Sequence, residues 1–217
     1  MVQLVNLCKS YAVGAERKVV ADRLSITFDP GAAIALLGRN GAGKSSLLRM
    51  IAGTMAPDSG QVIHTGSVSW PVGFSGSFHK DMTGAQNVRF VARVYGVDTQ
   101  HLSDFVEDFA ELGGHYRQPV RTYSSGMRSR LAFGVSMGIH FDTYLVDEVT
   151  SVGDARFKRK CNTVFKDRMK TCGAIVVSHS MPTIRRLCDV GMVLEEGRLL
   201  EFGDLEEAIE YHQATMA

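Results

Sequence analysis

The chain has 217 residues, of which 45% are hydrophobic and 22% charged, which is enough for one hydrophobic core of ordinary size. Its formal net charge at pH 7 is +1, which excludes a global field that would attract nucleic acid or an anionic membrane. The longest apolar run, residues 32–37, is far shorter than the roughly 20 residues of a membrane-spanning helix.

The first third of the chain is expected to be rich in strands, because apolar and polar side chains partly alternate there. Strands are expected in residues 2–7, 19–28 and 33–37 and around Val62 and Val68. A helix is expected from Lys44 to about Ala52, and the sequence APDSG that follows it predicts a turn.

Two helices are expected in the middle of the chain. Thr83 and Gln86 have the spacing of a capping box, so the first helix should begin after Thr83 and end near Gly96. The second helix places the apolar side chains of residues 102–112 on one face and should end at Gly113.

Strands and helices alternate in the rest of the chain. Strands are expected in residues 144–147, 174–178, 190–195 and 198–202, and helices in residues 155–170, in residues 182–188 and from Asp204, where Glu207 completes another capping box. Alternation of this kind predicts an α/β fold in which helices cover a mainly parallel sheet. The segment 83–140 is expected to form a helical subdomain on that core.

The sequence GRNGAGKS, residues 38–45, matches the phosphate-loop pattern G-x-x-x-x-G-K-[ST]. Its glycines let successive backbone N–H groups point at phosphate oxygens, and the helix that follows adds the positive end of its dipole. Lys44 is expected to reach the β- and γ-phosphates, and the Ser45 hydroxyl to help hold Mg²⁺. The residues expected to bind a nucleotide here are Gly38, Arg39, Asn40, Gly41, Ala42, Gly43, Lys44, Ser45 and Ser46.

Polar residues end two of the buried strands. Asp147 ends the strand of TYLVDE, where it is expected to hold Mg²⁺ through water, and Glu148 follows it, where it can activate an attacking water. His179 ends the strand of VVSHS. Strand ends on one edge of a parallel sheet gather at the ligand site, so His179 is expected to contact the γ-phosphate and keep the geometry of the water.

The motifs GRNGAGKS, YSSGM, YLVDE and SHS, in this order, resemble those of the ATP-binding subunits of ABC transporters over essentially the whole chain. The resemblance implies ATP and Mg²⁺ as cofactors and a single P-loop NTPase domain of ABC type over residues 1–217. Its RecA-like core, mainly parallel with an antiparallel β part, would cover about residues 1–82 and 141–217, and its helical subdomain about residues 83–140.

In this family YSSGM stands at the signature position, usually written LSGGQ. The resemblance therefore implies a head-to-tail homodimer, in which Ser124, Ser125 and Gly126 bind the γ-phosphate of the ATP held by the second copy. Tyr11 stands where the family often stacks an aromatic ring on adenine, and Asp154 in the D-loop that crosses between the two copies.

The chain departs from the family pattern at several positions. These are Tyr123, Ser125 and Met127 in the signature and Val149, which replaces the proline that usually follows the Asp-Glu pair. The usual Q-loop position falls near Phe74, where there is no glutamine, so His79 or a backbone group is expected to take its place.

The stretches SWPVGFSGSFHKDMTGAQNVRFVARVYG and YLVDEVTSVGDARFKRKC resemble one branch of the family, the exporters of capsular polysaccharide. O-antigen exporters often carry an extra carbohydrate-binding domain, for which there is no room after the last expected helix. This favours the capsule type and leaves open a teichoic-acid or O-antigen exporter without such a domain.

The resemblance also implies partners and a location. This chain would be peripheral, at the cytoplasmic face of the bacterial inner membrane. A separate integral membrane subunit would contact residues 72–95 and carry all contact with the membrane, and further envelope export proteins would join the exporter. Nucleic acid is not expected as a partner, and the basic run at residues 156–160 is expected to be a solvated helix face.

Three other functions are alternatives to that of a polysaccharide exporter subunit. A soluble ABC ATPase acting on DNA or ribosomes usually has two cassettes, a coiled-coil insertion or a basic extension, which this chain lacks. A P-loop kinase would need an acceptor site instead of a Ser-Ser-Gly anion site. An importer subunit is disfavoured only by the resemblance of the YSSGM region, and the identity of the sugar is not encoded in any of these motifs.

Overall fold

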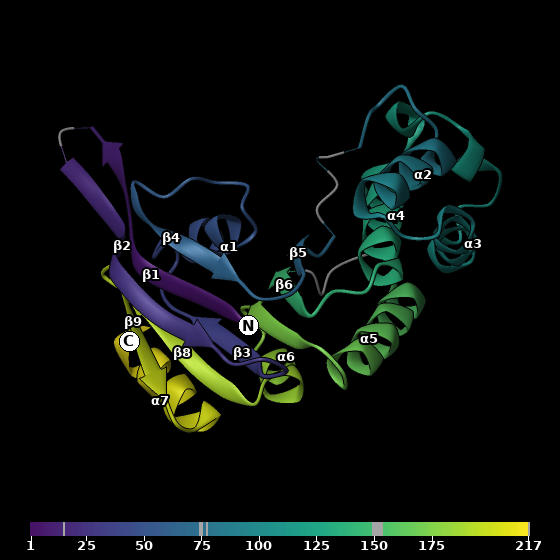
Figure 1. Cartoon of the computed structure of the whole chain (residues 1–217). Coiled ribbons are helices and arrows are strands. Elements are labelled where there is room, and N and C mark those ends of the chain that lie inside the picture. The colour runs from purple at the N-terminus through teal and green to yellow at the C-terminus, as the bar shows by residue number, and fades with distance from the viewer. Residues whose placement is uncertain (15, 74–75, 77, 149–153, 217) are drawn as a thin grey trace. The chain divides into compact units, whose positions relative to one another are not determined.

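The computed structural model describes residues 1–14, 16–73, 76, 78–148 and 154–216, which form two compact units (Figure 1). The first, here called the sheet unit, comprises Met1–Pro71, Phe141–Glu148 and Met169–Ala217. The second, here called the helical unit, comprises Val72–His140 and Val149–Arg168. In the described part of the chain, none of the helices combines the length and the apolar character needed to cross a membrane.

The larger sheet of the sheet unit has six strands in the order β5-β6-β7-β3-β8-β9. In chain order they are β3 (Ala33–Leu37), β5 (Val68–Pro71), β6 (Thr143–Asp147), β7 (Gly173–Val177), β8 (Val190–Glu195) and β9 (Arg198–Phe202). All neighbours pair in parallel except β8 and β9, which pair antiparallel. The predicted mainly parallel sheet is therefore confirmed, and the carboxyl ends of β3, β6 and β7 meet at one edge.

The smaller sheet has three antiparallel strands in the order β2-β1-β4. They are β1 (Val2–Val13), β2 (Glu16–Phe28) and β4 (Ser59–His64), which confirms the antiparallel β part. The hairpin of β1 and β2 places Tyr11 directly opposite Lys18. Residues that stand directly opposite in an antiparallel pair have side chains on the same face, so these two side chains lie together.

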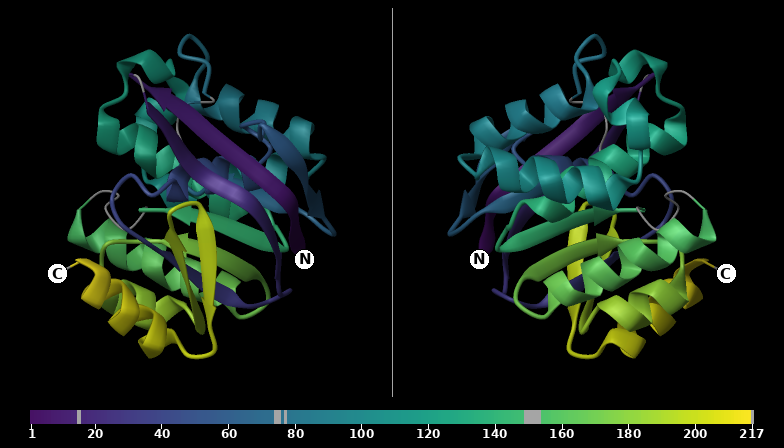
Figure 2. Two further views of the ribbon diagram at one scale, coloured as in Figure 1. Left: turned by 90° about the vertical axis from the view of Figure 1, so that its left-hand side faces the viewer. Right: turned by 90° about the vertical axis from the view of Figure 1, so that its right-hand side faces the viewer.

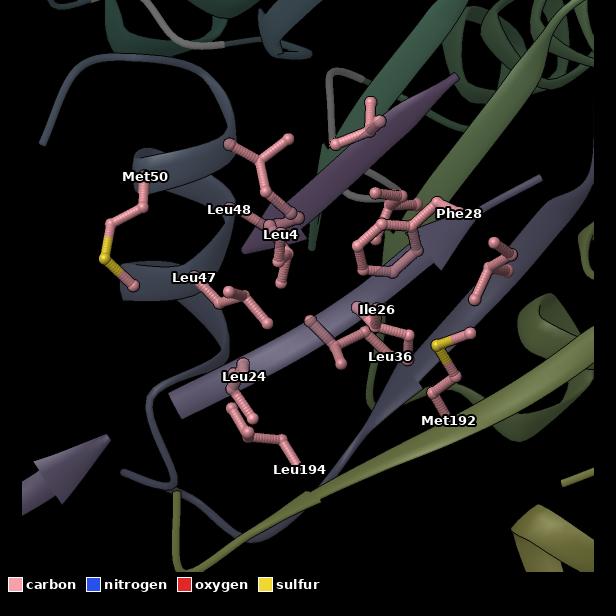
Figure 3. Close-up of a cluster of buried hydrophobic side chains, with 14 of the residues drawn as sticks. Leu4, Leu24, Ile26, Phe28, Leu36, Leu47, Leu48, Met50, Met192 and Leu194 are labelled. Carbon is pink, nitrogen blue, oxygen red and sulfur yellow. The ribbon is translucent and has the colours of Figure 1, made fainter. Parts of the chain in front are cut away.

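Helix α1 (Lys44–Ile51) packs between the two sheets, and its apolar side chains join both of them into one core (Figure 3). Leu47 and Leu48 come from α1, Leu24 and Ile26 from β2, and Leu36 from β3, and all five are buried. This burial holds α1 in place, and α1 begins with Lys44 and Ser45, the last residues of the phosphate loop.

Two further helices cover the opposite face of the larger sheet, α6 (Met181–Leu187) and α7 (Leu205–Met216) (Figure 2). Pro182 lies in the first turn of α6, where its missing N–H costs no hydrogen bond. The carboxylate of Asp204 accepts hydrogen bonds from the backbone N–H groups of Glu206 and Glu207, so α7 begins where the sequence predicts.

The helical unit contains α2 (Gly84–Tyr95), α3 (Thr99–Ala110), α4 (Ser125–Gly138), most of α5 (Ala155–Met169) and the short 3₁₀ helices Gly113–Arg117 and Val120–Thr122. Their contact is largely aromatic, since the ring of Phe109 stacks on those of Phe105 and Phe133 and meets the ring of Phe157 edge-on. Phenylalanines of α3, α4 and α5 thus pack together in the core of this unit.

Two expectations for the helical unit are corrected. Helix α3 ends at Ala110 and not near Gly113, because Glu111 adopts a left-handed conformation with φ of 52°. The basic run at residues 156–160 is not solvated throughout. Lys160 donates hydrogen bonds to the carbonyl oxygens of Asp108 and Phe109, both at 3.1 Å, and so caps the carboxyl end of α3.

Helix α2 begins with the predicted capping box. The Thr83 hydroxyl accepts from the N–H of Gln86 at 3.1 Å, and the Gln86 side chain accepts from the N–H of Thr83 at 2.9 Å. We expect Thr83→Ala to lower the free energy of unfolding by about 1 kcal/mol, because the N–H of Gln86 loses its partner. Urea denaturation followed by circular dichroism measures the change, with Thr83→Ser, which keeps the hydroxyl, as the control. Equal stability of all three proteins would contradict this role.

Candidate functional site

The phosphate loop leaves the buried strand β3 and enters α1, and its backbone needs glycine at defined positions. Gly38, Gly41 and Gly43 have φ of 143°, 78° and 110°, a region that other residues rarely adopt. A Cβ atom on Gly43 would lie 2.6 Å from the Cβ of Val20, and one on Gly38 would collide with the carbonyl oxygen of Leu194. Close packing under the loop therefore forces its curled shape.

Lys44 lies across this loop. Its ammonium donates hydrogen bonds to the carbonyl oxygens of Gly38 and Arg39 at 2.6 and 3.0 Å. Burial lowers the pKa of Lys44, whereas the carboxylates of Glu148 and Asp147 act in the opposite direction. The loop thus holds an ammonium group at the amino end of a helix, which is the arrangement that binds phosphate.

A cavity of about 400 Å³ beside the loop brings many of the predicted residues together. The predicted residues that line it are Tyr11, Asn40, Gly41, Gly43, Lys44, Ser45, Ser46, Asp147, Glu148 and His179. The other predicted loop residues, Gly38, Arg39 and Ala42, line a second cavity of about 500 Å³ that the loop shares with α7. Both cavities lie within the sheet unit.

Glu148 and His179 are in direct contact at the edge of the larger sheet. Strands β6 and β7 are neighbours, and Asp147 pairs with Val177, so the residues that follow these strands lie together. The Oε1 of Glu148 is 2.6 Å from the Nε2 of His179, with the two side chains 55% and 59% exposed. A carboxylate oriented by an imidazole and open to water is suited to general-base chemistry.

Glu148 has an unusual backbone. Its φ is 56°, in the left-handed region that side chains other than Asn and Asp seldom occupy, and its N–H donates to the carbonyl oxygen of Val177 at 3.0 Å. This hydrogen bond holds the residue against the end of β7. Backbone strain of this kind clusters at functional sites, and here it aims the carboxylate toward His179.

Tyr11 lies against the loop through its hydroxyl group, which donates to the Ser46 Oγ at 3.2 Å and contacts the Met55 Sδ at 3.0 Å. The ring therefore stands on one wall of the cavity that Lys44 and Ser45 also line. Its stacking on a base stays a prediction.

Two side chains of the cavity, those of Ser45 and Asp147, are candidate ligands for Mg²⁺. Ser45 and Asp147 line the same cavity, and a hydroxyl and a carboxylate are oxygen ligands of the kind that Mg²⁺ takes together with waters and phosphate oxygens. No group of three or more His, Cys, Asp or Glu side chains that could hold a metal ion occurs among the residues that the structure describes. The Ser45 hydroxyl and the Asp147 carboxylate fit a Mg²⁺ ion that phosphate oxygens also bind.

The signature residues stand at the amino end of α4 in the helical unit. Ser124 is the N-cap, and its Oγ accepts from the N–H of Met127 at 3.2 Å. Ser124 and Ser125 are exposed, and a Cβ atom on Gly126 would meet only the Ser124 Oγ, at 3.9 Å. An exposed helix start with open space in front of it is suited to an anion.

Asp154 is held within the helical unit. Its carboxylate accepts from the N–H groups of Arg156 and Phe157 at the start of α5 and from Arg130 of α4 at 2.8 Å. The Phe157 N–H and Arg130 lower the pKa of Asp154. The predictions about Val149 and Phe74 lie outside the described residues. The N–H of His79 donates to the Asn87 Oδ1 at 2.8 Å, and its suggested Q-loop role stays a prediction.

Some residues that line this cavity are not among the residues predicted from the sequence. Val13, Lys18, Val20 and Val177 line it, although none of them belongs to a motif. The positions of Val13, Lys18 and Val20 depend on how β1 pairs with β2, and that register would have placed Lys18 beside Tyr11.

Comparison with known proteins identifies close relatives. A family profile described as ABC transporter matches residues 21–151. The polysialic acid transport ATP-binding protein KpsT of Escherichia coli is 48% identical over 93% of this chain and 91% of its own. The capsule polysaccharide export ATP-binding protein CtrD of Neisseria meningitidis is 42% identical over 99% of both chains. An O-antigen export system ATP-binding protein, RfbB of Klebsiella pneumoniae, is 37% identical over 93% and 84%. The predicted resemblance is confirmed.

Solved structures confirm the fold class. The dimeric ATP-binding cassette MJ0796, in a post-hydrolysis state with ADP and Pi, superposes with a TM-score of 0.76 over 93% of this chain and 98% of its own, at 19% identity. The ATP-binding subunit of another ABC transporter gives a TM-score of 0.75 over 98% and 99%, at 18% identity.

The shape of the phosphate loop can be tested at Gly43. We expect Gly43→Ala to weaken the binding of MgATP by about tenfold or more, because the added Cβ meets Val20 and the required φ is strained. Isothermal titration calorimetry measures the affinity. Gly53→Ala is the control, since Gly53 also has a positive φ but faces open space at the other end of α1. Equal affinities of Gly43→Ala and the wild type would contradict this view of the loop.

Proposed function

Because the chain belongs to the ABC transporter family as one of its ATP-binding subunits, we propose that it binds and hydrolyses MgATP to drive the export of a capsular polysaccharide across the bacterial inner membrane. The observation that carries the polysaccharide assignment is the similarity, over nearly the full chain, to proteins named for polysialic acid transport and capsule polysaccharide export. The O-antigen relative is less similar and is covered to a smaller share of its own length.

Nucleotide binding is assigned to the cavity beside the phosphate loop. The N–H groups of residues 38–46 and the Lys44 ammonium bind the phosphates, while Tyr11 stacks on adenine. The Ser45 hydroxyl and, through water, the Asp147 carboxylate hold Mg²⁺, which shields the negative charge of the phosphates. The support for these roles is that side chains from β1, α1 and the end of β6 line a single cavity.

Hydrolysis is assigned to the Glu148–His179 pair. Glu148 accepts the proton of the attacking water, and His179, at 2.6 Å, keeps the carboxylate in place and contacts the γ-phosphate. The distance between these two groups, together with their position at the phosphate loop, is what favours a hydrolase over a domain that only binds nucleotide.

The second half of each site is assigned to another copy of the chain. Ser124 and Ser125 are exposed at the start of α4, beside Gly126, and an ATP-binding cassette of the same fold has been solved as a dimer. In the proposed head-to-tail homodimer these residues bind the γ-phosphate across the interface, and Asp154 lies at the crossing. Closure around ATP and opening after hydrolysis would then give the two states that drive transport.

A membrane subunit is assigned to the surface of residues 72–95. The chain itself is placed at the cytoplasmic face of the inner membrane, and further envelope export proteins complete the exporter. Phe90 and Val94 on α2 are 58% and 62% exposed although they are large and apolar. Exposed apolar side chains of this kind are typical of protein interfaces. They support the proposed contact.

The transport function is tested in the bacterium that encodes the chain. After deletion of its gene, we expect polysaccharide to disappear from the cell surface and accumulate inside. The wild type and the control Glu210→Gln, an exposed position on α7, should restore export, whereas Glu148→Gln should not, because it lacks the base. The readout is polysaccharide measured separately inside the cell and on its surface. Unchanged surface polymer after deletion would overturn the polysaccharide assignment.

The dimer role of the signature is tested with Gly126→Val. Because a side chain at this position meets open space within the chain, we expect normal stability and MgATP binding but a loss of ATP hydrolysis of about a hundredfold or more. Phosphate release by the purified protein measures hydrolysis. Gly114→Val is the control, since Gly114 also faces open space but lies outside the signature. Hydrolysis at the wild-type rate in Gly126→Val would refute the shared site.

A further inference from the structure

Lys18 lies beside the phosphate loop although it belongs to no phosphate-binding motif. A Cβ atom built on Gly41 would lie 3.0 Å from the Nζ of Lys18, so the ammonium stands directly over this part of the loop. Lys18 lines both the cavity that contains Lys44 and the one that the loop shares with α7. A second ammonium group therefore stands at the place where phosphate oxygens are expected.

The hairpin of β1 and β2 explains this position. Lys18 is the direct partner of Tyr11 across the two strands, so both side chains lie on the face of the hairpin that meets the loop. Tyr11 is anchored to Ser46 through its hydroxyl. The same strand pair thus places a cation beside Gly41 in the middle of the loop and an aromatic ring beside Ser46 in the first turn of α1.

The Lys18 ammonium has no competing partner. Among the residues that the structure describes it makes no hydrogen bond and no ion pair, and it is exposed. Arg17, the preceding residue, also lines the cavity that the loop shares with α7, but its guanidinium is occupied, since its Nε donates to the Ser10 Oγ at 2.7 Å and its Nη2 lies 3.9 Å from Asp58. Lys44, the other ammonium of the cavity, already donates to two loop carbonyl groups.

The charge of the ligand favours such a second cation. A nucleoside triphosphate with one bound Mg²⁺ still carries net negative charge, and the cavity also contains the carboxylates of Asp147 and Glu148. A flexible lysine at the rim can follow the phosphate chain as a point charge without a fixed geometry.

We infer that Lys18 is a nucleotide-binding residue whose ammonium group contacts the phosphate chain beside Gly41 of the loop. The inference rests on the nucleotide binding proposed above and adds a ligand to it. The β1–β2 hairpin then holds both the base, through Tyr11, and the phosphates, through Lys18. A nucleotide would therefore tie this hairpin to the loop.

The test compares the binding of MgATP and of adenosine, which has no phosphate, by equilibrium dialysis of the purified full-length chain. We expect Lys18→Ala to raise the Kd for MgATP about three- to tenfold and to leave that for adenosine within about twofold. Lys18→Arg, which keeps the charge, should stay within about twofold of the wild type for both ligands. Arg17→Ala removes the same charge from the adjacent residue, whose guanidinium is engaged with Ser10 and Asp58, and should have no comparable effect.

The other outcomes separate a failure of the inference about Lys18 from a failure of the proposed nucleotide site. If Lys18→Ala binds MgATP as tightly as the wild type while Lys44→Ala does not, Lys18 is not a ligand and the nucleotide site itself stands. If Lys18→Ala weakens adenosine as much as MgATP, the residue acts on Tyr11 or on the hairpin, and the inference is wrong. If the wild type binds no MgATP, the proposed function fails together with the inference.

Discussion

The burial of α1 between two sheets is the constraint on which the candidate site depends. Leu47 and Leu48 are buried and hold the first turns of α1 in the core, and the phosphate loop must turn just before them. Val20 and Leu194 then press on the loop from β2 and β8 and leave room for glycine alone at Gly43 and Gly38. The apolar core thus determines the direction of the N–H groups that face the cavity.

The contact between Glu148 and His179 in the cavity follows from the order of strands in the larger sheet. Because β6 and β7 are neighbours, residues more than 30 positions apart in the chain, Glu148 and His179, come within 2.6 Å. The register of the β1–β2 hairpin has a similar effect on Tyr11 and Lys18. Parallel strand pairing therefore brings Glu148 and His179 to the cavity, and antiparallel pairing brings Tyr11 and Lys18 to it.

Local patterns predicted most of the elements and the motif residues. The capping box at Thr83 and the phosphate loop were found because their physics lies within a few adjacent residues. Lys18 and the capping role of Lys160 were not found, because each depends on a partner far away in the sequence. The early end of α3 was missed for a different reason, since Glu111 takes a left-handed conformation that glycine normally takes.

The ion pair of Asp154 with Arg130 connects two helices of the helical unit. Arg130 also lies over the ring of Phe157, 4.5 Å from its centroid, so α4 and the start of α5 are joined by a charge contact and a cation–π contact side by side. Both contacts are made by the same guanidinium group, so the start of α5 is tied to α4 through one side chain. A displacement of α4 at Arg130 would therefore reach Asp154 and Phe157 together, within the helical unit itself.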